Sequence, residues 1–428
     1  MLSVYAKNIR GRIFKLLVLL ILVFNGGSII GQDSTFLTPS TINKNKKSSK
    51  KPKDKTAPKS WEIGGYVKYL SSVYLIHPPF NSPVLAYQNN LLHNRINFKW
   101  FINNAFTFKA DLRTRLFFGE FIKLQPNYGQ TILRADSLRN GYRDYLSWVI
   151  LDQPGAAIHS ILDRFYLQYS KGDFDLRLGR QRINWGINTI WNPNDIFNTF
   201  SFTDFDYEER SGTDALRVQY YTGVASSIEF AVKVATRWED FTTGFLWKTN
   251  KWNYDFQFLV GLLGQDIVLG GGWAGNIKNA GFKGEFSYFL NYADTSAQRH
   301  SFTGTLSIDY LFENSGYLTV GFLYNLRGST TINTNQLFAY QPSAKNLYPY
   351  RYSVFITYMQ AIKEVVNVGA TLVYSPGESH ALFISPSFSY SIKDNWDLSF
   401  VGQIALNTEG KYYISPTQVF FLRFKYSF

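Results

Sequence analysis

The stretch AFTFKADLRTRLFF, from Ala105 to Phe118, alternates between two kinds of side chain. Its mainly apolar positions are Phe106, Phe108, Ala110, Leu112, Thr114 and Leu116, and its polar, largely basic positions are Thr107, Lys109, Asp111, Arg113 and Arg115. Successive side chains of a β-strand point to opposite faces, so this pattern predicts a strand with one apolar and one charged face.

The same alternation recurs from Trp61 onward, for example in HNRINFKWFI (93–102) and WNYDFQFLV (252–260). A soluble sandwich would hide the apolar faces between two sheets, whereas a closed barrel would turn them to lipid. The apolar faces are rich in aromatic residues, as in the lipid-facing surfaces and interfacial girdles of membrane barrels. This composition favours the barrel.

The spacing of the expected strands also favours a barrel. We expect 18 strands, at 61–76, 91–103, 105–118, 161–170, 173–183, 213–222, 226–237, 241–249, 252–263, 266–275, 280–290, 300–312, 317–326, 350–361, 365–375, 380–391, 396–407 and 416–428. Short gaps follow even-numbered strands, and the long gaps 77–90, 119–160, 184–212 and 327–349 all follow odd-numbered ones. Short periplasmic turns and long outer loops produce this rhythm. The sequence therefore predicts an all-β fold, a transmembrane antiparallel up-and-down barrel of 16 to 18 strands.

The last ten residues, VFFLRFKYSF, place Phe420, Leu422, Phe424, Tyr426 and Phe428 on one face. This closing strand resembles the C-terminal signature of outer-membrane barrels, in which a final aromatic residue belongs to the assembly signal. The resemblance implies the outer-membrane barrel assembly machinery as a partner, together with the lipid bilayer and lipopolysaccharide. Too few residues remain for a large internal plug, so an energy-coupled receptor is not expected.

The N-terminus has the layout of a secretory signal peptide over 1–31, with four basic residues, the apolar run LLVLLILVF and small residues before a cleavage site near Gly31 and Gln32. Residues 32–60 are rich in Lys, Ser and Pro, and are expected to form a disordered tether. The barrel is expected to occupy 61–428.

The formal net charge of +13 lies mostly outside the expected barrel. Residues 1–31 carry four of these charges and residues 32–60 a net six, which leaves +3 for residues 61–428. A nearly neutral body removes the main support for nucleic-acid binding. The absence of Cys excludes disulfides, thiolate chemistry and a lipidated Cys anchor.

Three segments carry a resemblance to a known family: LDRFYLQY (162–169), LRLGRQRINWG (176–186) and WNPNDIFN (191–198). Their order is similar to that in outer-membrane porins of the alginate-export type and in related barrel families. The resemblance implies a barrel of about 18 strands and a diffusion or export pore, without defining the solute. A substrate site of the family can be carried over to Arg177, Arg180 and Arg182 alone.

Continued alternation after Leu178 would point Arg180 and Arg182 at lipid. An outward Arg at the bilayer midplane costs about 2 to 4 kcal/mol. Either these residues lie above the membrane, or Gly179 marks a bulge that turns them into the lumen. Both alternatives place them near the pore mouth.

The loop 184–212 is expected to fold inward and narrow the pore, with Pro193 stiffening its turn and Trp191 and Phe197 anchoring it. A loop packed over the rim is the alternative. Asn194 and Asp195 could bond local backbone or cap a short helix. The expected constriction residues are Arg180, Arg182, Trp191, Asn192, Pro193, Asn194 and Asp195.

Solute preference is expected to reside on the lumen wall of the second to sixth strands. The candidate pore-lining residues are Arg95, Lys99, Lys109, Asp111, Arg113, Arg115, Arg164, Arg177 and Arg217, with Asp163 and Asp175 among the acidic residues. Their positive surplus would favour anions. Alternatively, cross-strand ion pairs would only hold the wall together.

The remaining polar groups give weak support to a metal site or to catalysis. Asp204, Asp206, Glu208 and Glu209 could bind Ca²⁺ but match no compact calcium loop, and pairing with Arg180, Arg182 or Arg210 is preferred. Ser379 and His380 lack a nucleophile elbow. We expect no cofactor, no metal and no enzyme activity.

These patterns together predict a porin or exporter of the Gram-negative outer membrane, giving passive passage to small polar solutes, anions among them, or to oligosaccharides. A surface polysaccharide-binding or capsule-associated barrel with a closed lumen is the alternative, and a barrel enzyme is a third.

Overall fold

The computed structural model describes residues 60–428 except 79–82, 141, 143, 205–210 and 332–333. The expected signal peptide (1–31) and nearly all of the expected tether (32–60) lie outside the described residues.

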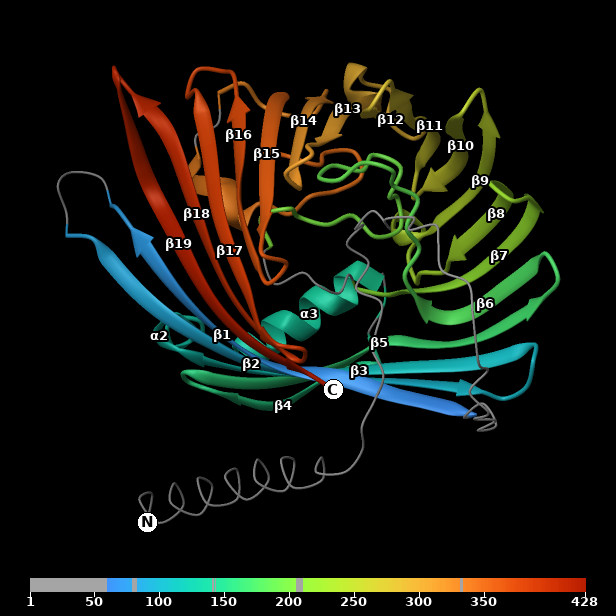
Figure 1. Ribbon diagram of the computed structural model, residues 1–428, viewed down its shortest axis with the longest axis horizontal. Coiled ribbons are helices and arrows are strands. Elements are labelled where there is room, and N and C mark those ends of the chain that lie inside the picture. Colours follow the sequence, from blue (N-terminus) through green and yellow to red (C-terminus); the bar gives the residue numbers. More distant parts are fainter. Residues whose placement is uncertain (1–59, 79–82, 141, 143, 205–210, 332–333) are drawn as a thin grey trace, which may run out of the picture. The chain divides into compact units, whose positions relative to one another are not determined.

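A single antiparallel sheet contains 19 strands, and its first strand pairs with both the second and the last, which closes it into a barrel (Figure 1). The strands are β1 (Trp61–Ile76), β2 (Leu85–Phe101), β3 (Phe106–Gly119), β4 (Ser147–Gln153), β5 (Ala156–Lys171), β6 (Phe174–Gln181), β7 (Thr213–Gly223), β8 (Ser226–Lys233), β9 (Thr242–Lys251), β10 (Tyr254–Leu263), β11 (Asp266–Ile277), β12 (Ala280–Asn291), β13 (His300–Leu311), β14 (Gly316–Asn325), β15 (Tyr352–Ile362), β16 (Val366–Ser375), β17 (Ala381–Lys393), β18 (Trp396–Glu409) and β19 (Tyr412–Ser427).

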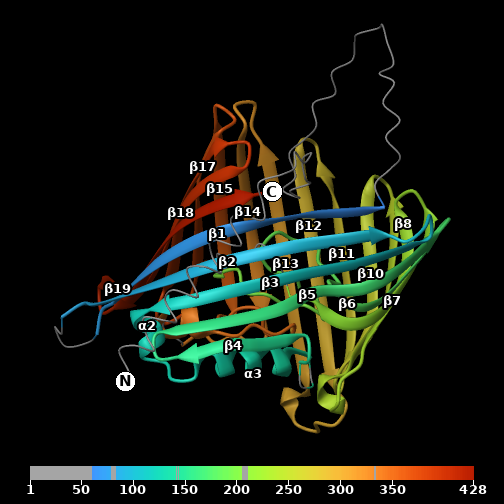
Figure 2. The ribbon, with the colours of Figure 1, turned by 90° about the horizontal axis from the view of Figure 1, so that it is seen from below.

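Two of these strands share one place in the wall. β4 pairs with residues 156–161 of β5, and β6 pairs with residues 165–171 of the same strand. The two short strands therefore follow one another along β5 (Figure 2). The ring has 18 places, which confirms the fold class and the strand number predicted from the alternating pattern.

The segment between β3 and β5 departs most from the sequence prediction. It holds α2 (Glu120–Lys123), α3 (Tyr128–Asn140) and β4, where we expected only a loop. The period-two pattern cannot reveal α3, and β4 has only seven residues. Among the residues that the structure describes, three 3-10 helices complete the elements: η1 (Trp238–Asp240), η2 (Ala297–Arg299) and η3 (Thr334–Ala339).

Several strand ends also differ from the prediction. β2 begins at Leu85 rather than at residue 91, because Leu85 and its neighbours continue the ladder with the outer end of β1. β5 begins at Ala156 rather than at 161, because its first residues form a hairpin with β4. In both cases the local sequence is polar or mixed and does not indicate a strand. Hydrogen bonds from a neighbouring strand extend the strand there.

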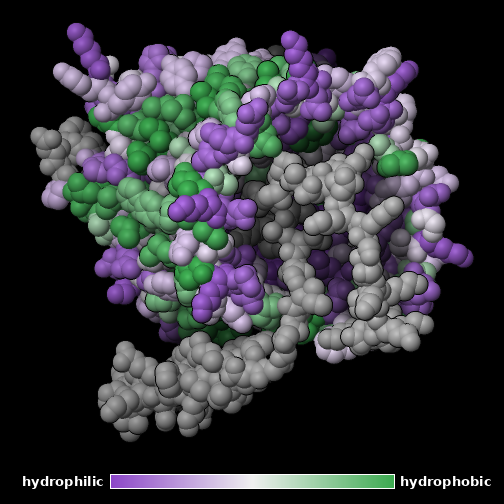
Figure 3. Space-filling model, in the orientation of Figure 1, coloured by the Kyte–Doolittle hydropathy of each residue, from purple (hydrophilic) through white to green (hydrophobic). Residues whose placement is uncertain are grey.

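Large apolar side chains cover the outside of the barrel. Leu178, Val260 and Ile308 are 59%, 55% and 50% exposed, although they lie in the middle of hydrogen-bonded strands. Figure 3 shows hydrophobic side chains gathered on the outer surface. Closure of the sheet pairs the backbone groups of every strand with a neighbouring strand. The apolar exterior provides a surface that is compatible with hydrocarbon. Among the described residues, no helix is both long and apolar enough to cross a membrane.

Candidate functional site

Charged side chains line the inner face of the barrel along its first strands. Residues that face one another in an antiparallel pair lie on the same side of the sheet, so the register transfers the assignment from strand to strand. Arg95 pairs with Arg113 and with Tyr66, and Tyr66 and Arg95 are both buried inside. We call the resulting set the basic wall: Lys68 on β1, Arg95 and Lys99 on β2, Lys109, Arg113 and Arg115 on β3, Arg164 on β5, and Arg423 and Lys425 on β19.

Ion pairs hold the centre of the basic wall together. Arg95 lies 3.0 Å from Asp111 and 2.7 Å from Asp163, and Arg113 lies 2.7 Å from the second oxygen of Asp163. Asp163 is the extra residue at a register shift between β3 and β5. This irregularity turns Asp163 toward the cations of the wall, although Arg164 already occupies the neighbouring inward position.

Other members of the basic wall remain open to water. The side chains of Lys99 and Lys109 are 42% and 33% exposed, and their carboxylate neighbours lie 3.9 Å and 3.4 Å away. Arg164 is buried and donates to the carbonyl oxygen of Asp163. The basic wall therefore has ion-paired arginines at its centre and solvent-accessible lysines beside them.

Arg177 and Arg217 face one another on β6 and β7, apart from the basic wall. Arg177 lies 3.1 Å from Asp175, and Arg217 makes two hydrogen bonds to Glu229, of 2.6 and 2.7 Å. Each arginine of this candidate pore-lining pair therefore forms an ion pair with a carboxylate.

Three members of the basic wall were missed by the sequence prediction: Lys68, Arg423 and Lys425. Closure of the barrel places β1 and β19 beside β2, so that Lys68 faces both His93 and Lys425. The closing strand does carry the signal, because Arg423 and Lys425 alternate with Leu422 and Phe424, which are 48% and 39% exposed on the outside.

Arg180 lies near the end of β6, at the junction along β5 where β6 ends and β4 begins. Its guanidinium group forms paired hydrogen bonds with Asp144, which precedes β4, and with Asp214 on β7, at distances of 2.6 to 3.1 Å. Only 1% of the residue is exposed. Gly179 has a φ of +120°, but β6 pairs with β5 and β7 through this residue without a register shift, so the expected bulge is absent there. Arg180 closes a seam of the wall and does not lie in the loop itself.

Arg182 follows the last residue of β6 and donates to the side chain of Asn184, at 3.2 Å. Arg180 and Arg182 were predicted to act together, but Arg180 is paired inside the wall and Arg182 lies at the start of the loop. Of the acidic residues suggested as their partners, Asp204 is exposed, and Asp206, Glu208 and Glu209 lie outside the described residues, as does Arg210.

Residues 182–204 of the connection between β6 and β7 lie against the inner face of distant strands (Figure 1). Glu285 on β12 accepts backbone hydrogen bonds from Ile187, Asn188 and Asn194, at 2.7, 3.3 and 2.6 Å. Gln403 on β18 donates to the carbonyl oxygen of Thr203. The segment therefore reaches from one side of the barrel to the other.

The WNPND turn is the most buried part of this segment, and all five residues, Trp191 to Asp195, are buried. Asn194 exchanges hydrogen bonds with Gly271 and Ser287, and Ser287 also donates to the carbonyl oxygen of Pro193. Asp195 accepts from the backbone nitrogens of Trp185 and Gly186. The turn is thus tied both to the wall and to the start of its own loop.

Apolar packing reinforces these hydrogen bonds. The ring of Trp191 lies within 5.4 to 5.7 Å of the rings of Phe202, Tyr348 and Phe355. Trp185 and Phe197 pack edge to face at 4.9 Å, over small wall residues such as Ala231. Apolar packing and hydrogen bonds to polar wall side chains thus hold the loop on this side of the barrel.

A second inward segment, between β14 and β15, was not anticipated as a lumen element. Lys345 forms a 2.5 Å ion pair with Asp266 on β11, and Asn325 donates to the carbonyl oxygen of Tyr348 at 2.6 Å. Thr334 of η3 donates to Asn407 on β18. The length of the gap predicted a long outer loop, but no periodic pattern shows on which side a loop lies.

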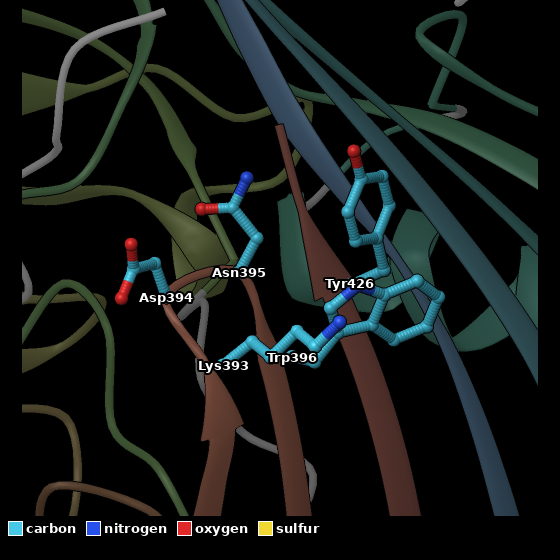
Figure 4. Close-up of a pocket in the computed structure, with 5 residues that line it drawn as sticks. All are labelled: Lys393, Asp394, Asn395, Trp396 and Tyr426. Carbon is cyan, nitrogen blue, oxygen red and sulfur yellow. The ribbon is translucent and has the colours of Figure 1, made fainter.

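The catalytic alternative concerns Ser379 and His380, and the metal alternative concerns the acidic residues between 204 and 209. Within the described ranges, no group of three or more His, Cys, Asp or Glu residues could hold a metal ion. The imidazole of His380 bonds to the hydroxyl of Tyr374, at 2.9 Å. A shallow pocket lined by Lys393, Asp394, Asn395, Trp396 and Tyr426 lies at the turn between β17 and β18 (Figure 4).

The chain was compared with known proteins. No protein-family model matches it, and no curated protein matches it. Solved structures of similar fold include Pseudomonas aeruginosa OpdQ, with a TM-score of 0.55 and 9% identity over 86% of this chain and 99% of that chain. Acinetobacter baumannii OccAB4 has a TM-score of 0.54 and 9% identity, over 86% and 98% of the two chains. For Pseudomonas aeruginosa OccK11 (OpdR) the values are 0.52 and 10%, over 85% and 96%.

These similarities establish the barrel fold over nearly the whole described chain. They do not support the narrower resemblance to porins of the alginate-export type.

Proposed function

We propose that this chain is a passive pore of a Gram-negative outer membrane, which admits small polar solutes or oligosaccharides and prefers anions. The closed barrel with an apolar exterior supports the location, because such a surface is stable only in contact with hydrocarbon. The similar solved structures share this fold at low sequence identity.

The uneven division of the barrel interior carries the proposal. Inward loops cover the inner face from β7 to β18, through the packing of Trp185 and Trp191 and through hydrogen bonds to Glu285 and Gln403. The basic wall lies on the remaining strands, β1 to β5 and β19. A solute path that avoids the packed loops therefore runs beside the basic wall.

Fixed positive charge beside a narrow aqueous path lowers the energy of a passing anion. Asp111 and Asp163 offset part of this charge, because they pair with Arg95 and Arg113. The more exposed Lys99 and Lys109 are the groups that retain the strongest influence on a solute in water.

Loop 184–212 sets the width of the path in this proposal. Its buried turn is fixed by Glu285 and Ser287 on one side, and Gln403 holds Thr203 on the other. These contacts hold the backbone of the loop itself, through the side chains of Glu285, Ser287 and Gln403.

Planar-bilayer recordings in a KCl gradient test the proposal directly. We expect open channels whose reversal potential indicates weak anion preference, and Lys109→Glu together with Lys99→Glu should shift it toward cations. Lys411→Glu, in the exposed turn between β18 and β19, is the matched control and should leave it unchanged. Clear cation selectivity of the unmodified chain would contradict the anion preference.

The alternative, a surface polysaccharide-binding barrel with a closed lumen, is favoured by one observation: α3 and two long loops all lie inside the strands (Figure 1). The same recordings separate the two, because a closed barrel conducts no ions. Polysaccharide retention by a protein that gives no channels would then favour the alternative.

A further inference from the structure

A pocket on the exterior of the barrel lies where β17 turns into β18. It has a volume of about 440 Å³, and it is lined by Lys393, Asp394, Asn395, Trp396 and Tyr426 (Figure 4). The carbonyl oxygen of Asn395 accepts from the backbone nitrogen of Ser427, at 2.9 Å, which fixes the turn to the closing strand. This turn belongs to the end of the barrel with short turns, which is the periplasmic end of outer-membrane barrels.

The aromatic members of the pocket face outward. Phe424 is 39% exposed on the outside, and Tyr426 occupies the next outward position of β19. Trp396 lies opposite Tyr426 in the register, with the two rings 4.5 Å apart. The ring of Trp396 also lies 5.0 Å from that of Phe424. The pocket is therefore on the lipid-facing side of the wall and not in the lumen.

A β-bulge places Lys393 on the same side. Asp397 lies opposite a residue of the basic wall, so its partner Ser391 faces the lumen. Strict alternation would turn Lys393 to the lumen as well. Lys393 lies opposite Trp396, however, because β17 has one extra residue, Ile392, at this point. The bulge therefore groups Lys393 with Trp396 on the exterior.

The ammonium group of Lys393 is available to a ligand. Lys393 is exposed, and it forms no ion pair with any carboxylate in the described part of the chain. Figure 4 shows the side chains of Lys393 and Asp394 pointing in different directions from the turn. Asn395, which is also exposed, adds the amide hydrogens of its side chain. The pocket thus offers a positive charge and hydrogen-bond donors beside two aromatic rings.

An exposed apolar strip leads from the pocket toward the middle of the bilayer. Phe388, Phe400 and Leu422 lie side by side on β17, β18 and β19, and they are 37%, 39% and 48% exposed. Phe400 is the second outward residue of β18 after Trp396, which places it about 13 Å along the strand. A ligand that fills both regions has a polar head and an apolar tail.

We propose that this pocket holds the phosphate-bearing headgroup of a glycerophospholipid from the periplasmic leaflet, whose acyl chains lie on the apolar strip. Lys393 and Asn395 donate hydrogen bonds to the phosphate oxygens, and the bond from the ammonium group is strengthened by charge. Trp396 and Tyr426 lie at the level of the headgroup, where aromatic rings of membrane proteins are enriched. The proposal depends on the outer-membrane location of the barrel, but not on its conduction or its anion preference.

The position of the pocket favours a lipid over a free phosphate ion. An exposed ammonium group binds a small anion weakly in water, because both ions remain well solvated. The acyl chains of a phospholipid already hold its headgroup at the membrane interface, so that the local concentration of phosphate beside Lys393 is high. A weak contact therefore suffices to retain a lipid there.

A second pocket at the same end of the barrel provides an internal comparison. It has a volume of about 350 Å³, and it is lined by Trp61, Ile63, Phe98 and Trp100. These four residues include no charged side chain that could bind a phosphate. We therefore expect this apolar pocket to accept acyl chains without regard to the headgroup, and selectivity for phosphate to arise at Lys393.

Native mass spectrometry of the folded barrel tests the site without a conduction measurement. The barrel is released from a non-ionic detergent that contains either dioleoyl phosphatidylglycerol or dioleoylglycerol, which has the same acyl chains and no phosphate. We expect the phospholipid to be retained on the protein and dioleoylglycerol to be lost. Equal retention of the two lipids would overturn the proposal.

Three variants make the assignment specific. Lys393→Gln should lower phospholipid retention about fivefold, the factor expected for one basic residue at a lipid surface. Lys393→Arg keeps the charge and should retain the lipid. Lys251→Gln removes an exposed lysine beside Trp252, 4.6 Å from the ring centroid, at the same end of the barrel. It is the matched control and should leave retention unchanged.

Equal retention by Lys393→Gln and the unmodified chain would refute the site, as would an equal loss in Lys251→Gln. Heat-modifiable migration shows that each variant barrel is folded before its lipids are measured. Because channel recordings do not enter this experiment, a failure of the lipid site and a failure of the proposed pore are seen separately.

Discussion

The indole nitrogen of Trp185 lies 2.6 Å from Oε1 of Glu229, the oxygen that also accepts from Nε of Arg217. One carboxylate on β8 thus fastens the beginning of an inward loop and neutralises an arginine of the neighbouring strand. The contact links the loop that we propose as the constriction to the charge on the wall beneath it.

Glu229→Ala should loosen the loop and leave Arg217 without its partner. Breaking a buried ion pair from one side costs about 3 to 5 kcal/mol, and the loss should appear as a lower urea midpoint for unfolding in lipid vesicles. Glu62→Ala is the control, because its side chain is 63% exposed and lies 3.9 Å from Lys99. Equal midpoints for the two variants would argue against the anchoring role of Glu229.

Glu285→Gln should release the WNPND turn from β12. A glutamine amide has one acceptor oxygen, and its NH₂ group would oppose the backbone donors of Ile187, Asn188 or Asn194. Each buried donor left unpaired costs about 1 to 3 kcal/mol.

We therefore expect protease cleavage within 184–204 and a larger single-channel conductance for Glu285→Gln. Glu313→Gln, at the exposed turn between β13 and β14, serves as the control. If the variant resists protease as the unmodified chain does, the carboxylate does not hold the loop.

Arg180→Lys should weaken the seam between β4 and β6. A single ammonium group cannot form paired hydrogen bonds with both Asp144 and Asp214. We expect a loss of about 2 kcal/mol of unfolding free energy. Arg237→Lys is the matched change at an arginine that is 62% exposed, where the pair with Asp240 should contribute less than about 1 kcal/mol.

Gly179→Ala should disturb the same seam through the backbone. Gly179 has a φ of +120°, and an added Cβ would lie 2.3 Å from the carbonyl oxygen of Phe165. Strain of this kind costs about 1 to 3 kcal/mol. In Gly223→Ala the new atom meets nothing closer than 3.8 Å, so a heat-unfolding assay should separate the two variants.

Val260→Arg tests whether hydrocarbon is what covers the barrel. Val260 is 55% exposed within β10, and an outward arginine near the bilayer midplane costs about 2 to 4 kcal/mol. Folding into lipid vesicles should become less complete. Val234→Arg, 66% exposed in the segment after β8, should fold normally, and an equal effect at both positions would contradict the lipid-facing assignment.

Alternation, aromatic-rich faces and the rhythm of gap lengths together predicted the barrel and its 18 places in the wall, and alternation assigned most of the basic residues to one face. Every second side chain of a strand points to the same face. Arg95, Lys109 and Arg113 could therefore be assigned to one side of the sheet from the sequence. Lys68, Arg423 and Lys425 obey the same rule, but they join the wall only when β1 and β19 meet.

The interior could not be predicted in this way. α3, β4 and the loop between β14 and β15 have no period that marks them as lumen elements, and their positions depend on contacts between residues far apart in sequence, such as Asn194 with Ser287 or Lys345 with Asp266. Hydrophobic periodicity is a local property that determines which side of a strand faces lipid. Which segments enter the barrel, and how Arg180 is paired, was decided by the tertiary structure, because hydrogen-bond partners are supplied only when the wall closes around them.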